Sequence, residues 1–484
     1  MGSADRHRGA IFPADQRAAA ERLSPRMGEL LDRVEAEPAL LARRSHQAAL
    51  TAARRHIPVL LGFDPAAPYG LQTWPLLLSA EREAELARAG RGLARLMRGV
   101  PQRFFAGDPT ALQRFYGLES EMLAILLLSE PLGIDEAICR LDMVDTVDGV
   151  QCIEFNCGNP AAWQDNSVSP ALAERSPFAD LLAAGSARWI DSADRLIRHA
   201  VRCGAAAPEV VGGELNLAIV VATHGVRYSL DNHPVDHYRD RFAAALAEVG
   251  GGRSGRLHMV TNDRLEFDAG RLVLDGDRIH VVVGDVDERS RAALFRAFKA
   301  GHLVHLSSPI GPLVLGDKRN LALLSENVGS GSFDDEEREV IERYVPWTRR
   351  VTSDAAAAFR GDGERPMPDL LLARRCDLVL KGALSAGGEA VVIGAAASEE
   401  AWRGAVEAAL DDGGWIVQEY LESATYPLRC GDDGWAPHRV VWGPFVFGDE
   451  YAGLFVRVMP ESLGSVVNMS TGAEVAMAFV VEDP

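Results

Sequence analysis

A short stretch of the chain concentrates side chains that can hold a metal ion or a phosphate. Arg140 and Asp142 lie two residues apart in one extended segment, and Glu154 and Asn156 lie two residues apart in the next. An Asp-Gly dipeptide at 148–149 separates the two segments and is a turn signal. Residues 138–156 are therefore expected to form a β-hairpin that carries all four side chains.

The length of the turn decides whether the two carboxylates meet. A two-residue loop at 148–149 pairs positions whose numbers add up to 297, which puts Asp142 and Glu154 on opposite faces. A three-residue loop at 147–149, with the glycine in the left-handed conformation, pairs Asp142 with Glu154. This second register also pairs apolar side chains on the other face, namely Leu141 with Phe155 and Met143 with Ile153. We expect the three-residue loop, because it separates an apolar face from a polar one.

The polar face has the chemistry of a magnesium site. Carboxylate and amide oxygens are hard ligands, and Mg²⁺ prefers a few protein oxygens together with phosphate oxygens. The same register places Arg140 opposite Asn156, where the guanidinium can contact a phosphoryl or carboxylate oxygen. A solvated strand face with a surface ion pair has the same residues, so the hairpin alone leaves both interpretations open.

Lysine is rare in this chain. Of 50 basic residues only three are lysines, Lys299, Lys318 and Lys381. A lysine supplies a compact point charge that arginine does not reproduce, although drift toward arginine codons would leave the same count. Lys318 precedes a helical segment, and Lys381 ends the apolar strand segment 378–380.

A glycine-rich turn follows Lys381 at 382–388, and such a turn lets backbone N–H groups approach a phosphate closely. It has neither the Gly-Lys-Ser/Thr ending of a Walker A loop nor a dinucleotide fingerprint, and an ordinary hairpin has similar glycines. The strand segment 415–419 leads into polar residues whose backbone can hydrogen-bond to a purine edge, although an ordinary buried strand has the same sequence pattern. Arg457 is the single basic residue of another alternating strand, 453–457, and Asn468 follows it.

Together these motifs resemble the circularly permuted group of the ATP-grasp superfamily, best known from the synthetase domain of glutathionylspermidine synthase. In the common ATP-grasp order, two phosphate-binding lysines precede the magnesium ligands. Here the Arg-x-Asp and Glu-x-Asn motifs precede Lys318 and Lys381. The resemblance covers residues 110–484, and the paired motifs of the hairpin are its most specific part.

The resemblance implies ATP and Mg²⁺ as cofactors and gives each motif a role. The implied metal ligands are Asp142, Glu154 and Asn156. The implied nucleotide-binding residues are Lys318 and Lys381 at the phosphates, Ser385, Gly387 and Gly388 in the lid turn, and Gln418, Glu419 and Tyr420 near adenine. The implied catalytic residues are Arg140 and Arg457, which would stabilise the transferring phosphoryl group.

The implied reaction is ATP-dependent ligation of a carboxylate to an amine through an acylphosphate, on an amino acid, a peptide or a polyamine. Phosphoryl transfer needs positioning and neutralisation of charge rather than a protein nucleophile. Phosphate transfer without amide formation and non-catalytic nucleotide binding remain as alternatives. The segment 157–163 lacks the acidic residue and serines of the glutathionylspermidine enzymes, which argues against glutathione as the substrate. Residues 1–110 contain no cysteine, so a Cys–His amidase domain is not expected.

The elements that must position these motifs give a multi-lobed chain of the α/β (α+β) class. Helical periodicity at 20–34, 80–97 and 109–127 predicts a helical N-terminal region. Strands that alternate with helices after residue 206 predict a small inserted α/β domain. The expected divisions are 1–135 for the helical N-terminal region, 136–205 for the first part of the ATP-grasp core, 206–305 for the small α/β (pre-ATP-grasp-like) domain, 306–400 for the lysine and lid region, and 401–484 for the second part of the core.

Composition limits the partners. A net charge of −19 argues against nucleic acid and anionic membranes, while a small anion can still bind where local cations meet it. Six cysteines without zinc-type spacing, and an N-terminus without an apolar segment, favour reduced thiols and a cytoplasmic location. We expect small-molecule or peptide carboxylate and amine substrates to contact residues 160–170, 285–288, and Arg227 with Tyr228.

Overall fold

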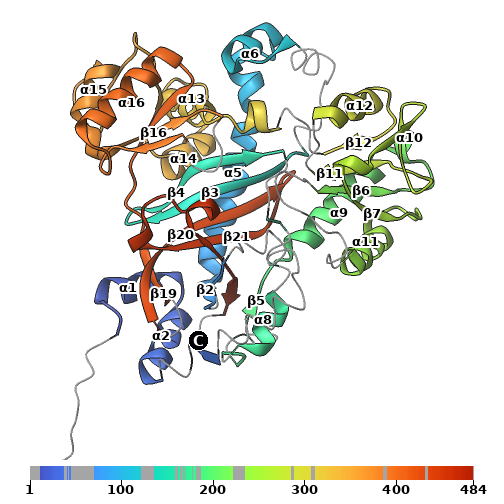
Figure 1. The fold of residues 1–484 in the computed structure, drawn as a ribbon, viewed down its shortest axis with the longest axis horizontal. Helices are drawn as coiled ribbons and strands as arrows, with labels where there is room; N and C mark the ends of the chain where they lie inside the picture. The colour runs from blue at the N-terminus through green and yellow to red at the C-terminus, as the bar shows by residue number, and fades with distance from the viewer. Residues whose placement is uncertain are drawn as a thin grey trace, which may run out of the picture.

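The computed structural model describes residues 11–37, 41, 43–44, 70–72, 74–120, 136–158, 162–163, 166, 169–176, 178–180, 182, 187–221, 235–284, 288–306, 311–384, 390–430 and 434–482. These residues combine helices with several sheets in a mixed α/β architecture, and Figure 1 shows smaller lobes arranged around a central sheet. None of the helices in the described ranges is both long enough and apolar enough to cross a membrane.

A seven-stranded sheet lies at the centre of the molecule (Figure 1). Its order is β1-β22-β21-β20-β3-β4, and β19 also pairs with β20. Its strands are β1 (Gly70–Leu71), β3 (Ile138–Thr146), β4 (Gly149–Cys157), β19 (Thr425–Cys430), β20 (Gly434–Phe447), β21 (Glu450–Pro460) and β22 (Glu474–Ala476). The sheet therefore joins segments that are about 300 residues apart in the chain, and it places Arg140 and Arg457 in one sheet.

Helix α5 (Ala80–Phe105) packs against β20, β21 and β3. Its buried positions include Leu86, Leu93 and Met97, which recur at helical spacing. The helix begins where the Ser79 hydroxyl accepts a hydrogen bond from the Arg82 N–H. It extends beyond the predicted end at residue 97, because Pro101 lies late in the helix without ending it.

The other predicted N-terminal helices are shorter than expected. The pattern at 20–34 forms two helices, α1 (Ala14–Leu23) and α2 (Pro25–Ala36), because Ser24 caps the second helix and Pro25 occupies its first position. Helix α6 (Pro109–Tyr116) begins after Asp108, whose side chain accepts a hydrogen bond from the Thr110 N–H, but it ends at Gly117 in the left-handed conformation. The predicted helix at 109–127 is therefore interrupted at residues 117–119; Ser120 is helical again, and residues 121–127 lie outside the described ones.

The N-terminal region also contributes strands. β1 pairs in parallel with β22, and β2 (Leu76–Ser79) pairs in parallel with β23 (Ala478–Val481), which pairs in turn with β5 (Ala187–Arg188). Residues before 135 are thus hydrogen-bonded to the last strands of the chain. Helix α8 (Ser169–Arg175) lies near β5 in Figure 1.

A second lobe, called the small-sheet lobe, contains Lys381. Its four-stranded sheet has the order β13-β18-β16-β17. Its elements are α13 (Arg319–Asn327), α14 (Asp335–Tyr344), β13 (Thr348–Arg350), β14 (Ala356–Ala357), β15 (Arg365–Pro366), α15 (Met367–Ala373), β16 (Leu378–Gly382), β17 (Val391–Ile393), α16 (Glu399–Asp412) and β18 (Trp415–Glu419). The division expected at residue 400 falls inside this lobe, because β18 pairs with β16 along its whole length.

A third lobe contains a four-stranded parallel sheet of order β12-β11-β6-β7. Its strands are β6 (Leu217–Val221), β7 (Leu257–Thr261), β11 (Val281–Gly284) and β12 (Val304–His305), and its helices are α9 (Ser192–Ala205), α10 (Pro208–Val211), α11 (Val235–Val249) and α12 (Glu288–Lys299). A small antiparallel sheet of β8 (Glu266–Asp268), β9 (Arg271–Leu274) and β10 (Asp277–Arg278) completes it. This is the alternation of strands and helices that the sequence predicts for 206–305.

Candidate functional site

The β3–β4 hairpin pairs Asp142 with Glu154 and Arg140 with Asn156, as expected. Toward the turn the register differs from the prediction, because Met143 pairs with Cys152 and leaves Ile153 as an extra residue. The loop therefore contains two residues, 147–148, and the predicted three-residue loop is wrong. Gly149 has a φ of 115°, which favours glycine there. A β-bulge supplies the one-residue shift that the longer loop was expected to supply.

Asp142 lies between two arginines. Its Oδ1 accepts a hydrogen bond from Arg140 Nε at 3.2 Å, and its Oδ2 is 2.6 Å from Arg457 Nη2. Burial opposes ionisation of this carboxyl, but Arg457 and Arg140 outweigh burial and lower the pKa of Asp142. Burial lowers the pKa of Arg140, against the attraction of Asp142. Asp142 is thus a buried carboxylate with two cationic partners.

The turn before α13 positions Lys318 beside the hairpin. The π-helical turn η4 (Gly311–Leu315) packs against β4, and a Cβ on Gly311 would lie 2.5 Å from Gly158 Cα. Only glycine permits this approach. Lys318 follows the turn, donates its backbone N–H to the Ala383 carbonyl, and places Nζ 3.0 Å from Glu154 Oε1.

Lys381 reaches the same hairpin from β16. Its ammonium donates to Gln418 Oε1 at 2.7 Å and to the Ile153 carbonyl at 2.9 Å. The bulge at Ile153 therefore supplies an acceptor for this lysine. Burial lowers the pKa of Lys381 to about 8, although the nearby Glu154 opposes that shift. Burial raises the pKa of the adjacent Cys152 thiol to about 12, so this cysteine is a protonated core residue rather than a nucleophile.

These side chains face one cavity between the central sheet and the small-sheet lobe, with about 950 Å³ that protein atoms leave empty, part of which is open to solvent. Asp142, Glu154, Lys318, Lys381 and Arg457 line it. Together with Arg140, which contacts Asp142, the inner group has four cations against two carboxylates, an excess of two positive charges. In a chain of net charge −19, this cavity is therefore a local anion-attracting site.

The segment after β18 forms another part of the wall. Gln418, Glu419 and Tyr420 all line the cavity. The Gln418 carboxamide is already engaged on both sides, because its Oε1 accepts from Lys381 and its Nε2 donates to Thr348 Oγ1. Glu419 is ion-paired with Arg360. Gln418 therefore holds Lys381 in place, rather than presenting a free carboxamide to the cavity.

Asn156 differs from the other predicted metal ligands. It is half-buried and does not line the cavity, and its Nδ2 is a buried atom without a hydrogen-bond partner among the described residues. The two carboxylates, by contrast, face each other across the hairpin at the cavity wall. Oxygens of this kind, at the wall of a cavity with an excess of cations, fit Mg²⁺. Asp142 and Glu154 fit such an ion better than Asn156 does.

Several expected contacts lie outside the described residues: Ser385, Gly387 and Gly388 of the lid turn, Arg227 and Tyr228, residues 285–287, and most of 160–170. Conversely, sequence reasoning missed Arg439 and Thr348. Arg439 lines the cavity from β20 and is hydrogen-bonded to Glu461, and Thr348 holds Gln418. Arg439 alternates with Val441 on its strand, which was the available signal, whereas nothing in the sequence marks Thr348.

The third lysine is placed differently from the other two. Lys299 is the last residue of α12 and is exposed. Two of the three lysines therefore converge on one cavity although they come from different elements. The scarcity of lysine was a useful signal at these two positions and an uninformative one at the third.

Comparison with known proteins gives a likeness of fold and little else. No family model matches the chain, and no curated protein matches its sequence. Among solved structures, the chain resembles a glutathione synthetase-like effector from Globodera pallida, solved in its apo form, with a TM-score of 0.56 and 11% sequence identity. The match covers 92% of this chain and 98% of the effector. The chain thus has a mixed α/β fold similar to that of a glutathione synthetase-like protein.

Proposed function

We propose that this chain is an ATP-dependent carboxylate–amine ligase of the circularly permuted ATP-grasp type. The observation that carries the proposal is the cavity whose inner cations exceed its carboxylates by two. ATP bound with one Mg²⁺ carries an excess of negative charge that such a site would compensate. The likeness to a glutathione synthetase-like fold supports a ligase-type architecture, but the substrate is inferred from the chemistry of the site alone.

In this proposal the nucleotide phosphates bind between the two lysines. Lys381 would donate to phosphate oxygens from the small-sheet lobe and Lys318 from the start of α13. The adenine would lie against the backbone of Glu419 and Tyr420, since both line the cavity and the Gln418 side chain is engaged elsewhere.

Asp142 and Glu154 would hold Mg²⁺, which neutralises charge on the phosphates when it is bound. The residues of the chain then position the reactants. Arg457 lines the cavity and would contact the transferring phosphoryl group, whereas Arg140 acts through Asp142 and is a positioning residue. Lys318 must exchange part of its contact with Glu154 for a phosphate oxygen, which couples nucleotide binding to the freeing of that carboxylate.

The chemistry would proceed in two steps. An oxygen of the substrate carboxylate attacks the γ-phosphorus, the bond to the β,γ-bridging oxygen breaks, and an acylphosphate and ADP result. An amine then attacks the acyl carbon, phosphate leaves, and the amine loses a proton as the amide forms. The inner group of the cavity has two more cations than carboxylates. This excess positive charge would stabilise the negative charge that moves onto ADP. Substrates of this class are amino acids, peptides and polyamines.

The test is ADP release by the purified chain with ATP and Mg²⁺, against a panel of amino acids, peptides and polyamines in pairs. Release that requires both a carboxylate and an amine, with the amide found by mass spectrometry, supports ligation. Release with one acceptor alone and a stable phosphorylated product would show a phosphotransferase instead. Tight ATP binding without turnover of any pair would show a non-catalytic nucleotide-binding protein and overturn the proposal.

A further inference from the structure

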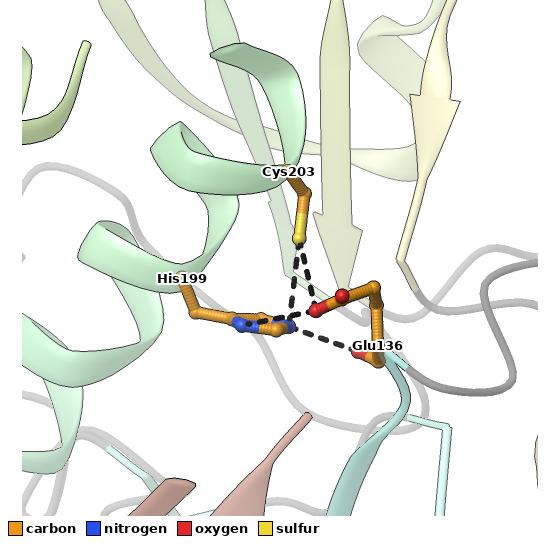
Figure 2. A group of neighbouring side chains, drawn as sticks. All are labelled: Glu136, His199 and Cys203. Atoms are coloured by element: carbon orange, nitrogen blue, oxygen red, sulfur yellow. Dashed lines mark hydrogen bonds and ion pairs between the residues drawn. The ribbon is translucent and has the colours of Figure 1, made fainter. Parts of the chain in front are cut away.

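A second group of side chains lies near the start of β3, outside the cavity. Glu136 precedes the strand, and His199 and Cys203 lie one turn apart on α9, so both point from the same helix face toward Glu136 (Figure 2). One donor atom from each residue can be chosen so that all three lie within 4.8 Å of one another. We propose that Glu136, His199 and Cys203 bind a divalent transition-metal ion of the zinc type.

The distances suit a tetrahedral ion. Cys203 Sγ is 3.5 Å from Glu136 Oε2, and His199 Nδ1 is 3.7 Å from the same oxygen. Zinc bonds of about 2.3 Å to sulfur and about 2.0–2.1 Å to nitrogen or oxygen place neighbouring ligand atoms about 3.3–3.6 Å apart in a tetrahedron. Cys203 Sγ lies 3.7 Å from His199 Nε2, so the thiol would rotate toward Nδ1 to bring the three donors around one ion.

The imidazole is held in a suitable orientation. His199 Nε2 lies 2.9 Å from the Glu136 carbonyl, a contact that places the ring proton on Nε2 and leaves the lone pair of Nδ1 for a metal. A histidine ligand commonly has such an acceptor on its other nitrogen. The ring is almost fully buried and packs against Phe447, so its orientation is fixed before any ion binds.

Access and ligand type point to the class of ion. The Glu136 side chain is 52% exposed while the His199 side chain is 3% exposed, so an ion would enter from the Glu136 side and a water molecule could complete its coordination. A thiolate with an imidazole and a carboxylate favours zinc-type ions over Mg²⁺, which prefers oxygen ligands alone. The site is therefore chemically distinct from the Asp142–Glu154 pair.

Binding would release a proton. Burial, together with the Glu136 carboxylate, raises the pKa of the Cys203 thiol, so without an ion the thiol stays protonated and donates to Glu136 Oε2. Formation of the metal–sulfur bond breaks the S–H bond and passes H⁺ to solvent, so that one thiol and one divalent ion give a metal thiolate and one proton. The ion would tie the start of β3 to α9 and so support the strand that carries Asp142.

Cobalt(II) titration of the purified full-length chain tests the site. Co²⁺ should bind at one equivalent, give a thiolate-to-cobalt charge-transfer band in the near ultraviolet, and be displaced by Zn²⁺. The band should disappear in Cys203→Ser and remain in the matched control Cys376→Ser, which removes an exposed cysteine elsewhere. Absence of the band in the unmodified chain, or its persistence in Cys203→Ser, would overturn the proposal.

A second variant distinguishes the loss of a metal ligand from misfolding of the chain. Glu136→Gln changes an exposed carboxylate and should leave the fold intact, as checked by circular dichroism. It should weaken Co²⁺ binding at least tenfold and abolish the rise in melting temperature that Zn²⁺ produces in the unmodified chain. Equal affinity and an equal rise in the variant would show that Glu136 is not a ligand, and the three-residue site would be rejected. No arm of the test depends on ATP turnover.

Discussion

The two walls of the cavity carry their charges differently. On the central-sheet wall, Asp142 is paired with Arg457 at 2.6 Å, and Glu154 is paired with Lys318 at 3.0 Å. On the small-sheet wall, the Lys381 ammonium donates to two neutral oxygens, those of Gln418 and Ile153. A paired wall is costly to break, while a buried ammonium with neutral partners gains from an incoming anion. Under the proposed function, the small-sheet wall would attract the phosphates and the central-sheet wall would have to rearrange to receive them.

The largest expected effect tests the central-sheet wall. Glu154→Gln keeps the volume but removes a charged oxygen ligand, so ADP release should fall by about 10²–10³, or roughly 2.7–4 kcal/mol, the size of one preorganised electrostatic contact. Steady-state ADP release at saturating Mg²⁺ measures it. Asp148→Asn, in the exposed turn of the same hairpin, is the matched control and should keep normal turnover. Near-normal turnover in Glu154→Gln, or sensitivity at Asp148, would reject Glu154 as a metal ligand.

The next effect compares the two lysines with the third. Lys381→Met should weaken ATP binding about 10–100-fold, since a hydrogen bond to a charged group is worth about 1.5–3 kcal/mol. It should also raise the melting temperature, because it removes a buried charge whose partners are neutral oxygens. Lys318→Met should weaken binding less, because Lys318 is already ion-paired with Glu154 and therefore gains less from a phosphate than Lys381, whose partners are neutral. Calorimetric titration with ATP measures both.

Lys299→Met is the control for the lysine pair. Lys299 is exposed at the end of α12, so the variant should bind ATP with unchanged affinity. A loss of affinity in Lys299→Met equal to that in Lys381→Met would show that binding depends on the net charge of the chain rather than on the cavity.

The sequence predicted the residues and contacts of the two cavity walls with unequal success. The hairpin and its facing carboxylates were predictable because cross-strand pairing follows from side-chain alternation and a turn signal. The turn itself was predicted wrongly, because a bulge at Ile153 and a longer loop shift the register by the same single residue, and local sequence does not distinguish them. The meeting of Lys318 and Lys381 with the hairpin was suggested by lysine scarcity and by family resemblance, not by any local pattern.

What the sequence could not supply are the contacts between distant segments. Gln418 was expected near adenine, but its carboxamide bridges Lys381 and Thr348, a geometry that depends on the pairing of β16, β18 and β13. The cluster of Glu136, His199 and Cys203 was also missed, because only the two helical residues have a recognisable spacing. Glu136 joins them through the packing of α9 beside the start of β3.

The pH dependence of nucleotide binding tests the small-sheet wall alone. Burial lowers the pKa of Lys381 to about 8 from 10.5, so the lysine loses its charge as the pH rises through 8. ATP affinity should then fall by up to tenfold per pH unit above 8, and this slope should be absent in Lys381→Met. For stability the sign is opposite, because the unfolded chain holds this proton up to a higher pH. The contribution of Lys381 to the free energy of unfolding is therefore most favourable above pH 10.5, where the lysine is neutral in both states, and this contribution is lost as the pH falls through 8.

The smallest effect concerns the residue that holds Lys381. Gln418→Met removes one of the two neutral acceptors of the ammonium, which should destabilise the fold by about 1–3 kcal/mol at pH 7. A loss of packing alone would be the same at every pH. The destabilisation caused by losing an acceptor of a charged group should instead become smaller as Lys381 becomes neutral. The difference in unfolding free energy between Gln418→Met and the unmodified chain should therefore be smaller at pH 9.5 than at pH 7. Urea unfolding at both pH values measures this, with Gln151→Met, a substitution of a half-exposed glutamine on β4, as the control that should show no such change. A pH-independent difference for Gln418→Met would mean that this glutamine fills space beside Lys381 without stabilising its charge, and the contrast between a paired and an unpaired wall would then rest on the carboxylates alone.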